Sequence, residues 1–272
     1  MPTLELAAPI AAGRTAEVFA YGDGRVLKLL RPGFPARLGE QEARLVELVA
    51  KVYDAAPRYL GTEAVDGRFG LVFERVVGPT MDARLRSRLW EVAHLGRTLG
   101  RLHAEMHDAS GAGLPDQSRT LRDAIERATP ELPDGAADAA LARLDQLPTG
   151  GVLCHGDVHP GNVILGADRT VVIDWENARS GSAAADVARA VYLMADTPIP
   201  NPRALRPLVV AVRRRFVGAY LAGYRERRAM TDRELRAWRL PILAARMAEG
   251  IEDERAALRA AITTELPASR PG

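Results

Sequence analysis

Apolar and polar residues alternate in short runs over the first part of the chain, a pattern that favours half-buried strands. Runs of this kind cover residues 17–21, 26–30, 58–65 and 69–77. Between the second and third runs, apolar positions recur at helical spacing over residues 38–53. Asp66-Gly67 separates the last two runs and is a strong hairpin-turn signal. The pattern predicts a small sheet carrying one helix over residues 1–78.

Beyond residue 78 most apolar stripes have helical spacing. Helices are expected over residues 89–106, 186–194 and 205–220. Thr231 and Glu234 form a capping box that opens a last helical region, in which Pro241 should produce a kink. Residues 109–151 read as a looser stretch with short helical pieces. One strand pair is expected, over residues 151–165 and 170–174, with its turn at residues 166–168. We therefore expect two domains, residues 1–78 and 79–272.

Composition narrows the class of protein. The 272 residues are 47% hydrophobic and 26% charged, as in an ordinary globular protein. Lys and Arg total 37 against 35 Asp and Glu, a balance that argues against a nucleic-acid partner. The single cysteine, Cys154, excludes an intramolecular disulfide and a CxxC zinc or redox site. We expect no membrane span and no signal peptide, and therefore a cytoplasmic location. We also expect no protein partner.

Most of the candidate chemistry lies in one polar loop, His155-Gly156-Asp157-Val158-His159-Pro160-Gly161-Asn162. Apolar residues flank this loop on both sides, so we expect its polar side chains at the tip of a rigid hairpin, where loops usually carry function. Downstream, Asp174 ends the apolar run Val171-Val172-Ile173. A strand-end carboxylate close to a loop carboxylate and an amide suits Mg²⁺, which prefers hard oxygen ligands and shares them with phosphate.

This pattern, H-G-D-x-x-x-x-N followed by I-D-W, resembles the catalytic and metal loops of the aminoglycoside phosphotransferase and choline kinase family, relatives of the protein kinases. Upstream, residues 12–19 resemble the phosphate-covering loop, 26–29 the strand with the nucleotide lysine, 40–44 the helix with its glutamate partner, and 73–76 the hinge. The resemblance implies an α+β, bilobal, protein-kinase-like fold. Its small N-terminal lobe would be an antiparallel sheet with one helix, its larger C-terminal lobe mainly helical, and the nucleotide would lie between them.

The resemblance also implies roles for individual side chains. Asp157 would be the catalytic residue that accepts the proton of the substrate hydroxyl. Asn162 and Asp174 would hold Mg²⁺, and Lys28, paired with Glu42, would bind the nucleotide phosphates. Such a pair avoids an isolated buried charge. Further nucleotide contacts are expected at Gly13, Thr15, Glu74 and Val76.

These roles imply a phosphotransferase that uses ATP or GTP with Mg²⁺ and acts on a hydroxyl of a small molecule. Asp186 resembles the acid that braces the catalytic loop. The interval from Asp174 to Asp186 is too short for a peptide-binding platform, so a protein substrate is disfavoured. The family and an acidic set near the C-terminus favour an aminoglycoside or related antibiotic, and hence antibiotic resistance. The set comprises Glu249, Glu252, Asp253 and Glu254. An exposed helix turn is its plain alternative, and a kinase of a sugar, an amino alcohol or another metabolite stays open.

Two other classes of function fit parts of the sequence. A nucleotide-binding regulator would keep the same motifs and form no product. A metal hydrolase would use the H-x-D-x-H motif of His155, Asp157 and His159, but zinc needs three ligands and an open position. No further histidine motif follows it, and the histidines that precede it on a helix are His94, His103 and His107. We expect His155 to be a structural hydrogen-bonding residue and Cys154 to be part of the core, and Lys28 has the alternative of a surface lysine.

Overall fold

A computed structural model describes residues 8–197 and 203–266 of the chain. The chain divides into two compact units, Met1–Arg86 with Pro160–Ala178 and Ser87–His159 with Arg179–Gly272. The division follows internal packing, and the domain boundary expected at residue 78 stays a prediction. Residues 1–7, at which no signal peptide is expected, lie outside the described residues.

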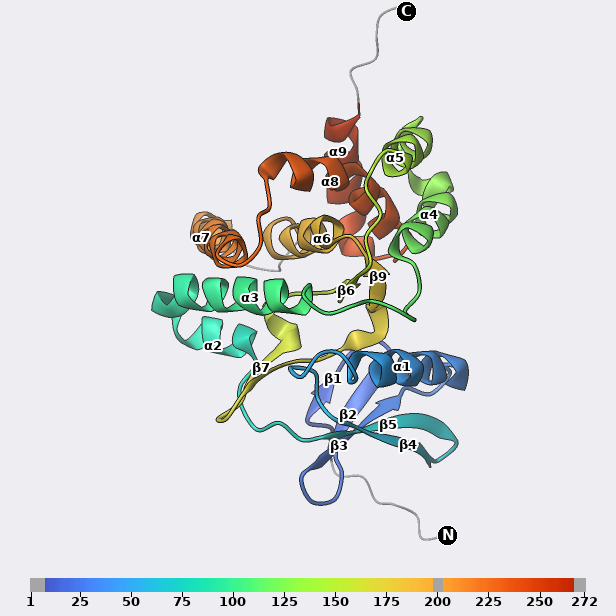
Figure 1. The fold of residues 1–272 in the computed structure, drawn as a ribbon, viewed down its shortest axis with the longest axis vertical. Helices are drawn as coiled ribbons and strands as arrows, with labels where there is room; N and C mark the ends of the chain where they lie inside the picture. Colours follow the sequence, from blue (N-terminus) through green and yellow to red (C-terminus); the bar gives the residue numbers. More distant parts are fainter. Residues whose placement is uncertain (1–7, 198–202, 267–272) are drawn as a thin grey trace, which may run out of the picture. The chain divides into compact units, whose positions relative to one another are not determined.

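The first unit contains a five-stranded antiparallel sheet with the strand order β1-β2-β3-β5-β4 (Figure 1). The strands are β1 (Ala11–Ala12), β2 (Ala16–Ala20), β3 (Arg25–Leu30), β4 (Tyr59–Val65) and β5 (Arg68–Glu74). Helix α1 (Ala36–Val49) packs against β4 and β5. The expected sheet with one helix is confirmed, and so is the hairpin turn, where Asp66 and Gly67 have φ values of 50° and 74°.

Strand β3 shows how alternation positions a charged residue. Leu27 and Leu29 are fully buried in a core that also contains Phe19 and Val72. Successive side chains of a strand point to opposite faces of the sheet. Lys28 therefore lies on the face opposite this core, where its ammonium group avoids apolar surroundings.

A second, short ladder of the first unit joins β7 (Val163–Leu165) to β8 (Thr170–Val172). Its turn falls at residues 166–168 as expected. The register pairs Val163 with Val172. The pairing extends one residue beyond the ladder, because Ile173 N–H donates to the Asn162 carbonyl at 2.9 Å. The chain segments on either side of this ladder are thus held next to one another.

The polar loop at residues 155–162 is not the tip of a hairpin, and that expectation is wrong. Strand β6 (Val152–Cys154) precedes the loop and pairs with β9 (Arg179–Gly181), whereas β7, which follows it, pairs with β8. Gly156 has a φ of 78°, and the short 3-10 turn Pro160–Asn162 follows. The extended chain is interrupted at both points, so the loop connects two separate ladders.

The second unit is mainly helical within the described residues. Its helices are α3 (Val92–Met106), α4 (Gln117–Ala128), α5 (Ala136–Asp145), α6 (Ala183–Ala195), α7 (Arg206–Arg225), α8 (Asp232–Met247) and α9 (Glu252–Glu265), and α2 (Met81–Ser87) precedes them. Helix α3 packs along α7, and α8 contacts α4, α5, α6 and α9. Thr231 and Glu234 form the expected capping box at the start of α8, which continues through Pro241.

Residues 109–151 are more ordered than their composition predicts. They contain two full helices, α4 and α5, where short helical pieces in a loose chain were expected. The Asp116 carboxylate accepts a hydrogen bond from Arg119 N–H at 2.6 Å and caps α4. Leu121 and Ile125 provide the buried stripe of α4. Tertiary packing of this narrow stripe against α8 outweighs the Pro and Gly content of the segment.

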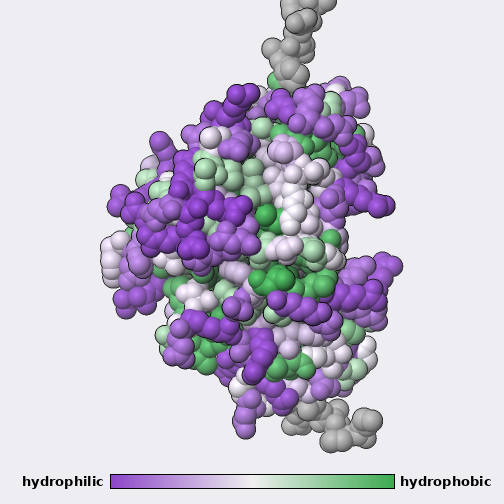
Figure 2. All heavy atoms as spheres, in the orientation of Figure 1, coloured by the Kyte–Doolittle hydropathy of each residue, from purple (hydrophilic) through white to green (hydrophobic). Residues whose placement is uncertain are grey.

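None of the helices in the described part of the chain is both long and apolar enough to span a membrane. On the face drawn in Figure 2, hydrophilic residues predominate and hydrophobic residues form small groups between them.

Candidate active site

One lysine and two carboxylates form an ion cluster in the first unit. Lys28 Nζ on β3 donates to Glu42 Oε1 on α1 at 2.8 Å and to Asp174 Oδ1, just after β8, at 2.7 Å. The Glu42 side chain is 6% exposed, that of Lys28 15% and that of Asp174 36%. Three residues that the sequence singled out are therefore together, and the cluster opens to solvent at Asp174. The alternative of an unpartnered surface lysine does not hold for Lys28.

The charges of this cluster depend on one another. Burial alone would lower the pKa of Lys28, but the charges of Glu42 and Asp174 outweigh it, so that pKa is raised and the ammonium stays protonated. Burial raises the pKa of Glu42, while the Lys28 charge opposes the rise. One ammonium is thus shared by two carboxylates, which leaves the cluster with a surplus of negative charge when all three groups are ionised. A cation is the ligand that this surplus favours.

Asn162 and Asp174, the predicted metal ligands, lie at the same end of the β7–β8 ladder. Asn162 is buried, and its carbonyl accepts the hydrogen bond from Ile173, the neighbour of Asp174. Asp174 has a φ of 69°, a left-handed conformation that non-glycine residues seldom adopt and that often marks a functional position. A carboxylate and an amide are hard oxygen donors, and Asp174 is open to solvent, so this donor set fits Mg²⁺ with phosphate or water completing the coordination.

Gly13 and Thr15 belong to the turn between β1 and β2, as the expected phosphate-covering loop requires. Gly13 N–H donates to the Ala16 carbonyl at 2.8 Å, which closes the turn. Arg31 holds the turn from the end of β3, since its Nε donates to the Gly13 carbonyl at 3.0 Å and its backbone N–H to the Thr15 carbonyl at 2.8 Å. Arg31 is a residue of this loop region that the sequence did not single out.

The expected hinge residues behave differently from one another. The Glu74 carboxylate accepts a hydrogen bond from Arg58 N–H at 2.8 Å and pairs with Arg169, so the side chain is committed to the protein. Val76 follows β5 and is half-buried, and its backbone N–H and carbonyl form no hydrogen bond with the described residues. Any contact of this hinge with a nucleotide base would therefore use backbone atoms near Val76 rather than the Glu74 side chain.

Asp157 lies in the second unit, in the loop after β6. Its backbone N–H donates to His155 Nδ1 at 3.1 Å, and its Oδ2 lies 3.6 Å from His159 Nε2. Burial would raise the pKa of Asp157, but the hydrogen bond and charge of His159, followed by the charges of Arg189 and His155, lower it well below its ordinary value. Asp157 is therefore ionised, and an ionised carboxylate orients a hydroxyl proton even where it is a weak base. His155 is buried and acts as the expected structural hydrogen-bonding residue.

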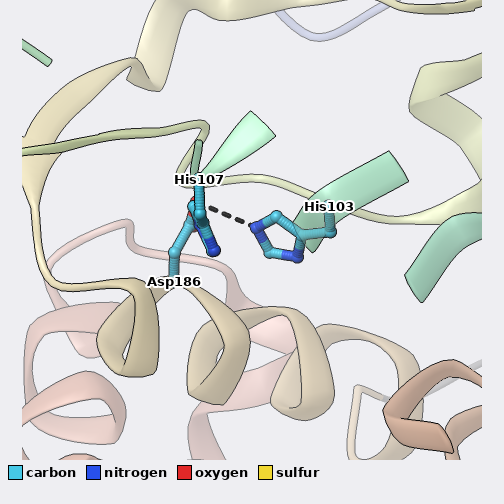
Figure 3. Close-up of side chains that lie close together, drawn as sticks. All are labelled: His103, His107 and Asp186. Atoms are coloured by element: carbon cyan, nitrogen blue, oxygen red, sulfur yellow. Dashed lines mark hydrogen bonds and ion pairs between the residues drawn. The ribbon is translucent and has the colours of Figure 1, made fainter. Parts of the chain in front are cut away.

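The backbone before Asp157 is held by Asp186, from the first turn of α6. Asp186 Oδ2 accepts from His155 N–H at 2.7 Å, and Oδ1 accepts from Gly156 N–H at 2.9 Å. Figure 3 shows Asp186 beside the rings of His103, on α3, and His107, which directly follows α3. His103 Nε2 lies 3.1 Å and His107 Nε2 3.4 Å from Asp186 Oδ2. Burial would raise the pKa of Asp186, but hydrogen bonds and charges of His103 and then His107 lower it.

Within the described residues, His103, His107 and Asp186 lie close enough together to share a cation. Their hydrogen bonds are nevertheless complete, because His103 Nδ1 bonds to the Tyr220 hydroxyl at 2.6 Å and His107 Nδ1 to the Tyr224 hydroxyl at 2.8 Å. Burial, followed by the charge of His103, lowers the pKa of His107 to about 4, so the ring is neutral near pH 7. The group is a closed hydrogen-bonding network, and its three possible cation ligands do not include His155, Asp157 or His159, the motif of the hydrolase hypothesis.

The acidic set near the C-terminus is largely committed to arginines. Glu249 pairs with Arg189 and Arg246, and both oxygens of Glu254 accept from Arg246, at 2.8 and 2.9 Å. Glu252 pairs with Arg255. Ion pairing of this kind leaves little free negative charge for ammonium groups of a substrate, so the structure favours a structural role for most of the set.

Cys154 is fully buried at the end of β6, and its Sγ lies 3.7 Å from the Ser182 carbonyl. Burial raises the pKa of the thiol, so the thiolate does not form near neutral pH. Cys154 is a core residue, as expected.

The sequence did not assign roles to the partners of Asp186, although it contained a signal for them. His103 and His107 are four residues apart, as are Tyr220 and Tyr224, and residues at that spacing share one face of a helix. Two polar aromatic pairs on helices with otherwise apolar stripes indicate a buried polar network between those helices. Only the contact between α3 and α7 shows which pair meets which.

Comparison with known proteins decides the family. A model described as "Phosphotransferase enzyme family" matches residues 7–230, most of the chain. The chain belongs to this phosphotransferase enzyme family. An uncharacterized protein of Deinococcus radiodurans is 29% identical to this phosphotransferase over an alignment of 262 positions, and the alignment covers 82% of this chain and 72% of that protein.

Solved structures confirm the fold of this family member. A thermostable mutant of aminoglycoside phosphotransferase APH(4)-Ia, in a ternary complex with ADP and hygromycin B, has a TM-score of 0.61 at 16% identity, over 96% of this chain and 93% of that one. A choline kinase of Cryptosporidium parvum has a TM-score of 0.57 at 14% identity, over 96% and 87% of the two chains. The chain is a member of the phosphotransferase enzyme family with a bilobal, protein-kinase-like α+β fold.

Proposed function

We propose that the protein transfers the γ-phosphoryl group of ATP or GTP to a hydroxyl of a small molecule, with Mg²⁺ as its metal. The observation that carries the proposal is the Lys28–Glu42–Asp174 cluster with Asn162 at the same ladder end. An ammonium fixed by two carboxylates is preorganised to bind phosphate oxygens, and the carboxylate and amide suit the metal of a nucleotide complex. Bound Mg²⁺ would neutralise charge that develops on the phosphate oxygens.

The proposed reaction divides the work among residues of this chain. The substrate oxygen forms a bond to the γ-phosphorus, the bond between that phosphorus and the β,γ-bridging oxygen breaks, and the nucleoside diphosphate leaves. Asp157 accepts the hydroxyl proton and orients the attacking oxygen. Lys28 binds the phosphates, and Asn162 and Asp174 hold the metal. The turn with Gly13 and Thr15 covers the phosphates, while the backbone near Glu74 and Val76 receives the base.

The acceptor is proposed only as a hydroxylated small molecule. Aminoglycosides and related antibiotics are the first compounds to test, because a structural neighbour was solved with hygromycin B. The ion pairs of Glu249 and Glu254 weaken the electrostatic argument for a polycationic acceptor, so sugars, amino alcohols and other metabolites belong in the same screen. A reaction that consumes a nucleoside triphosphate belongs where triphosphates are made, so the cytoplasm remains the proposed location.

The test is a screen of hydroxylated compounds with γ-labelled nucleotide and Mg²⁺. Asp157→Ala should lower kcat by about 10²- to 10⁴-fold while the nucleotide affinity stays unchanged. Asp174→Ala should instead weaken binding of the Mg²⁺–nucleotide complex. Asp168→Ala is the matched control, since it removes an exposed carboxylate from the turn between β7 and β8.

Four results would contradict the proposal. Full turnover by Asp157→Ala would remove the catalytic assignment. Normal Mg²⁺–nucleotide affinity of Asp174→Ala would remove the metal assignment. Nucleotide binding without any phosphorylated product across the screen would indicate a regulator, and tightly bound zinc in the purified protein would indicate the hydrolase.

A further inference from the structure

The peptide groups just before Asp157 are held from two sides. Gly156 N–H donates to Asp186, and the Gly156 carbonyl accepts a hydrogen bond from Arg189 Nε. Gly156 has a φ of 78°, a conformation that glycine adopts without the strain that a side chain would cause. Fixing both the N–H and the carbonyl of one residue defines its two peptide planes. The starting direction of the Asp157 backbone is thereby defined as well.

Arg189 is itself held in place. It lies on α6, and while its Nε binds the loop, its Nη2 donates to Glu249 Oε1 at 2.7 Å. The Arg189 side chain is 14% exposed, and Glu249 follows the C-terminal end of α8. The planar guanidinium makes both bonds at once in a fixed fork geometry, which the point charge of a lysine does not reproduce.

Glu249 is anchored in turn by residues of α8 and α9. Arg246 pairs with Glu249 and binds both oxygens of Glu254, and the Tyr192 hydroxyl donates to Glu254 at 3.1 Å. Arg246 and Glu254 are each 7% exposed, so water and salt screen these pairs weakly. A continuous chain of charge-assisted hydrogen bonds therefore leads from the first turn of α9 to the Gly156 carbonyl.

We propose that Arg189 is a positioning residue for phosphoryl transfer, which orients Asp157 through the Gly156 carbonyl and is itself oriented by Glu249. The proposal rests on the function proposed for Asp157 and adds a role for a residue that contributes no ligand to the nucleotide or the metal. It assigns the Glu249–Arg246–Glu254 ion pairs to loop geometry rather than to recognition of a cationic substrate.

The test compares Arg189→Gln, Arg189→Lys and Glu249→Gln with the control Arg239→Gln. Arg239 lies on the same helix as Arg246 and pairs with Asp196 and Glu265, without contact to the loop. Arg189→Gln should lower kcat by about 10- to 100-fold, the loss expected for one charge-assisted hydrogen bond. Arg189→Lys keeps the charge and loses the fork, so it should lie nearer to Arg189→Gln than to the wild type. Glu249→Gln should show a smaller loss in the same direction.

Nucleotide affinity is the readout that separates positioning from general damage. The dissociation constant of the Mg²⁺–nucleotide complex should stay within about twofold of the wild type in all these variants, because Lys28, Glu42 and Asp174 make no contact with Arg189. A parallel loss of kcat and nucleotide affinity, or wild-type kcat in Arg189→Gln, would overturn the proposal. Full rescue by Arg189→Lys would also overturn it, because charge alone would then suffice.

Hydrogen exchange of the backbone tests the same role without any substrate. Amides of residues 155–157 should exchange faster in Arg189→Gln and Glu249→Gln than in the wild type, and at the wild-type rate in Arg239→Gln. If no acceptor is ever phosphorylated, the proposed function fails, while faster exchange still supports the loop brace. Unchanged exchange in both loop variants would remove the brace even where the kinase is active. If Arg189→Gln does not fold, Glu249→Gln and Arg189→Lys decide the question.

Discussion

The Lys28 cluster and the Asp186 network both contain several ionisable groups, but they satisfy them in different ways. In the Lys28 cluster the charge is shared by three side chains, and Asp174 is 36% exposed. In the Asp186 network the carboxylate accepts four hydrogen bonds and is 1% exposed, and its histidine partners have 0% exposed side chains. One group keeps a free carboxylate edge for a ligand, whereas the other uses all of its polar atoms internally.

This difference separates binding groups from bracing groups. A charge that must bind phosphate or metal has to remain partly solvated, so part of its bonding capacity stays unused until the ligand arrives. A charge that only holds backbone in place is most effective when buried and fully bonded, because water then does not compete. The two regions should therefore respond differently to mutation and to pH.

The largest effect is expected from Asp186→Ala. The variant leaves the backbone N–H groups of His155 and Gly156 and two histidine N–H groups without an acceptor, which should cost about 4 kcal/mol of unfolding free energy. Urea unfolding followed by circular dichroism measures the loss. Asp196→Ala is the control, because Asp196 pairs with Arg239 at 3.1 Å on the surface and should cost under about 1 kcal/mol.

If Asp186→Ala is too unstable to purify, Asp186→Asn keeps one carbonyl acceptor and should show an intermediate loss. Equal costs at Asp186 and Asp196 would contradict the distinction between bracing and surface charges.

The pH dependence of stability is the next largest effect. The pKa of His107 is about 4 in the folded protein, below the ordinary 6.5, so the unfolded chain binds more protons between these values. Stability due to this ring is complete above pH 6.5 and is lost as pH falls towards 4, by at most about 3 kcal/mol. Urea unfolding at several pH values measures this slope. His107→Gln should abolish it in this window, and an unchanged slope would contradict the assignment.

The sequence predicted those parts of the molecule that depend on local patterning. The β2–β5 strands, the Asp66-Gly67 turn and the capping box at Thr231 follow from alternation and turn chemistry and are confirmed. The predicted pairing partner of β6 was wrong, because a three-residue strand followed by a polar loop carries no local information about a strand 25 residues downstream. Strand pairing is set by tertiary packing, which periodicity does not encode.

The candidate site shows the same division. The sequence motifs singled out Asp174, Lys28 and Glu42, which the structure brings together in one ion cluster. Arg189 escaped notice because arginine is abundant in this chain, and only its contact with the Gly156 carbonyl distinguishes it. The acidic set at the C-terminus looked free for the same reason, since its arginine partners are identified by folding rather than by spacing.

A smaller loss of stability, with the opposite pH dependence, is expected from Lys28→Met. The variant leaves the buried Glu42 beside Asp174 without the ammonium, which should cost about 2 kcal/mol at pH 7. Burial already raises the pKa of Glu42, and loss of Lys28 raises it further. The folded variant therefore binds a proton more tightly than its unfolded chain, and stability relative to the wild type should recover as pH falls through that raised pKa. Urea unfolding at neutral and acidic pH checks this sign.

Lys51→Met is the matched control, because the only other lysine is exposed. It should leave stability within about 0.5 kcal/mol of the wild type at every pH. A Lys28→Met loss that grows on acidification would contradict the assignment of a buried, unpaired Glu42.

The smallest effect is expected at the outer layer of the network, from Tyr224→Phe. His107 Nε2–H donates to Asp186, so its Nδ1 carries a lone pair that accepts the Tyr224 hydroxyl at 2.8 Å. Loss of the hydroxyl should cost about 1 kcal/mol near pH 7 and raise the pKa of His107, because the hydrogen bond favours the neutral ring. The acid-induced loss of stability should therefore be shallower than in the wild type. Tyr192→Phe removes the hydroxyl that binds Glu254 and should leave that slope unchanged, so equal slopes in the two variants would contradict the link between Tyr224 and His107.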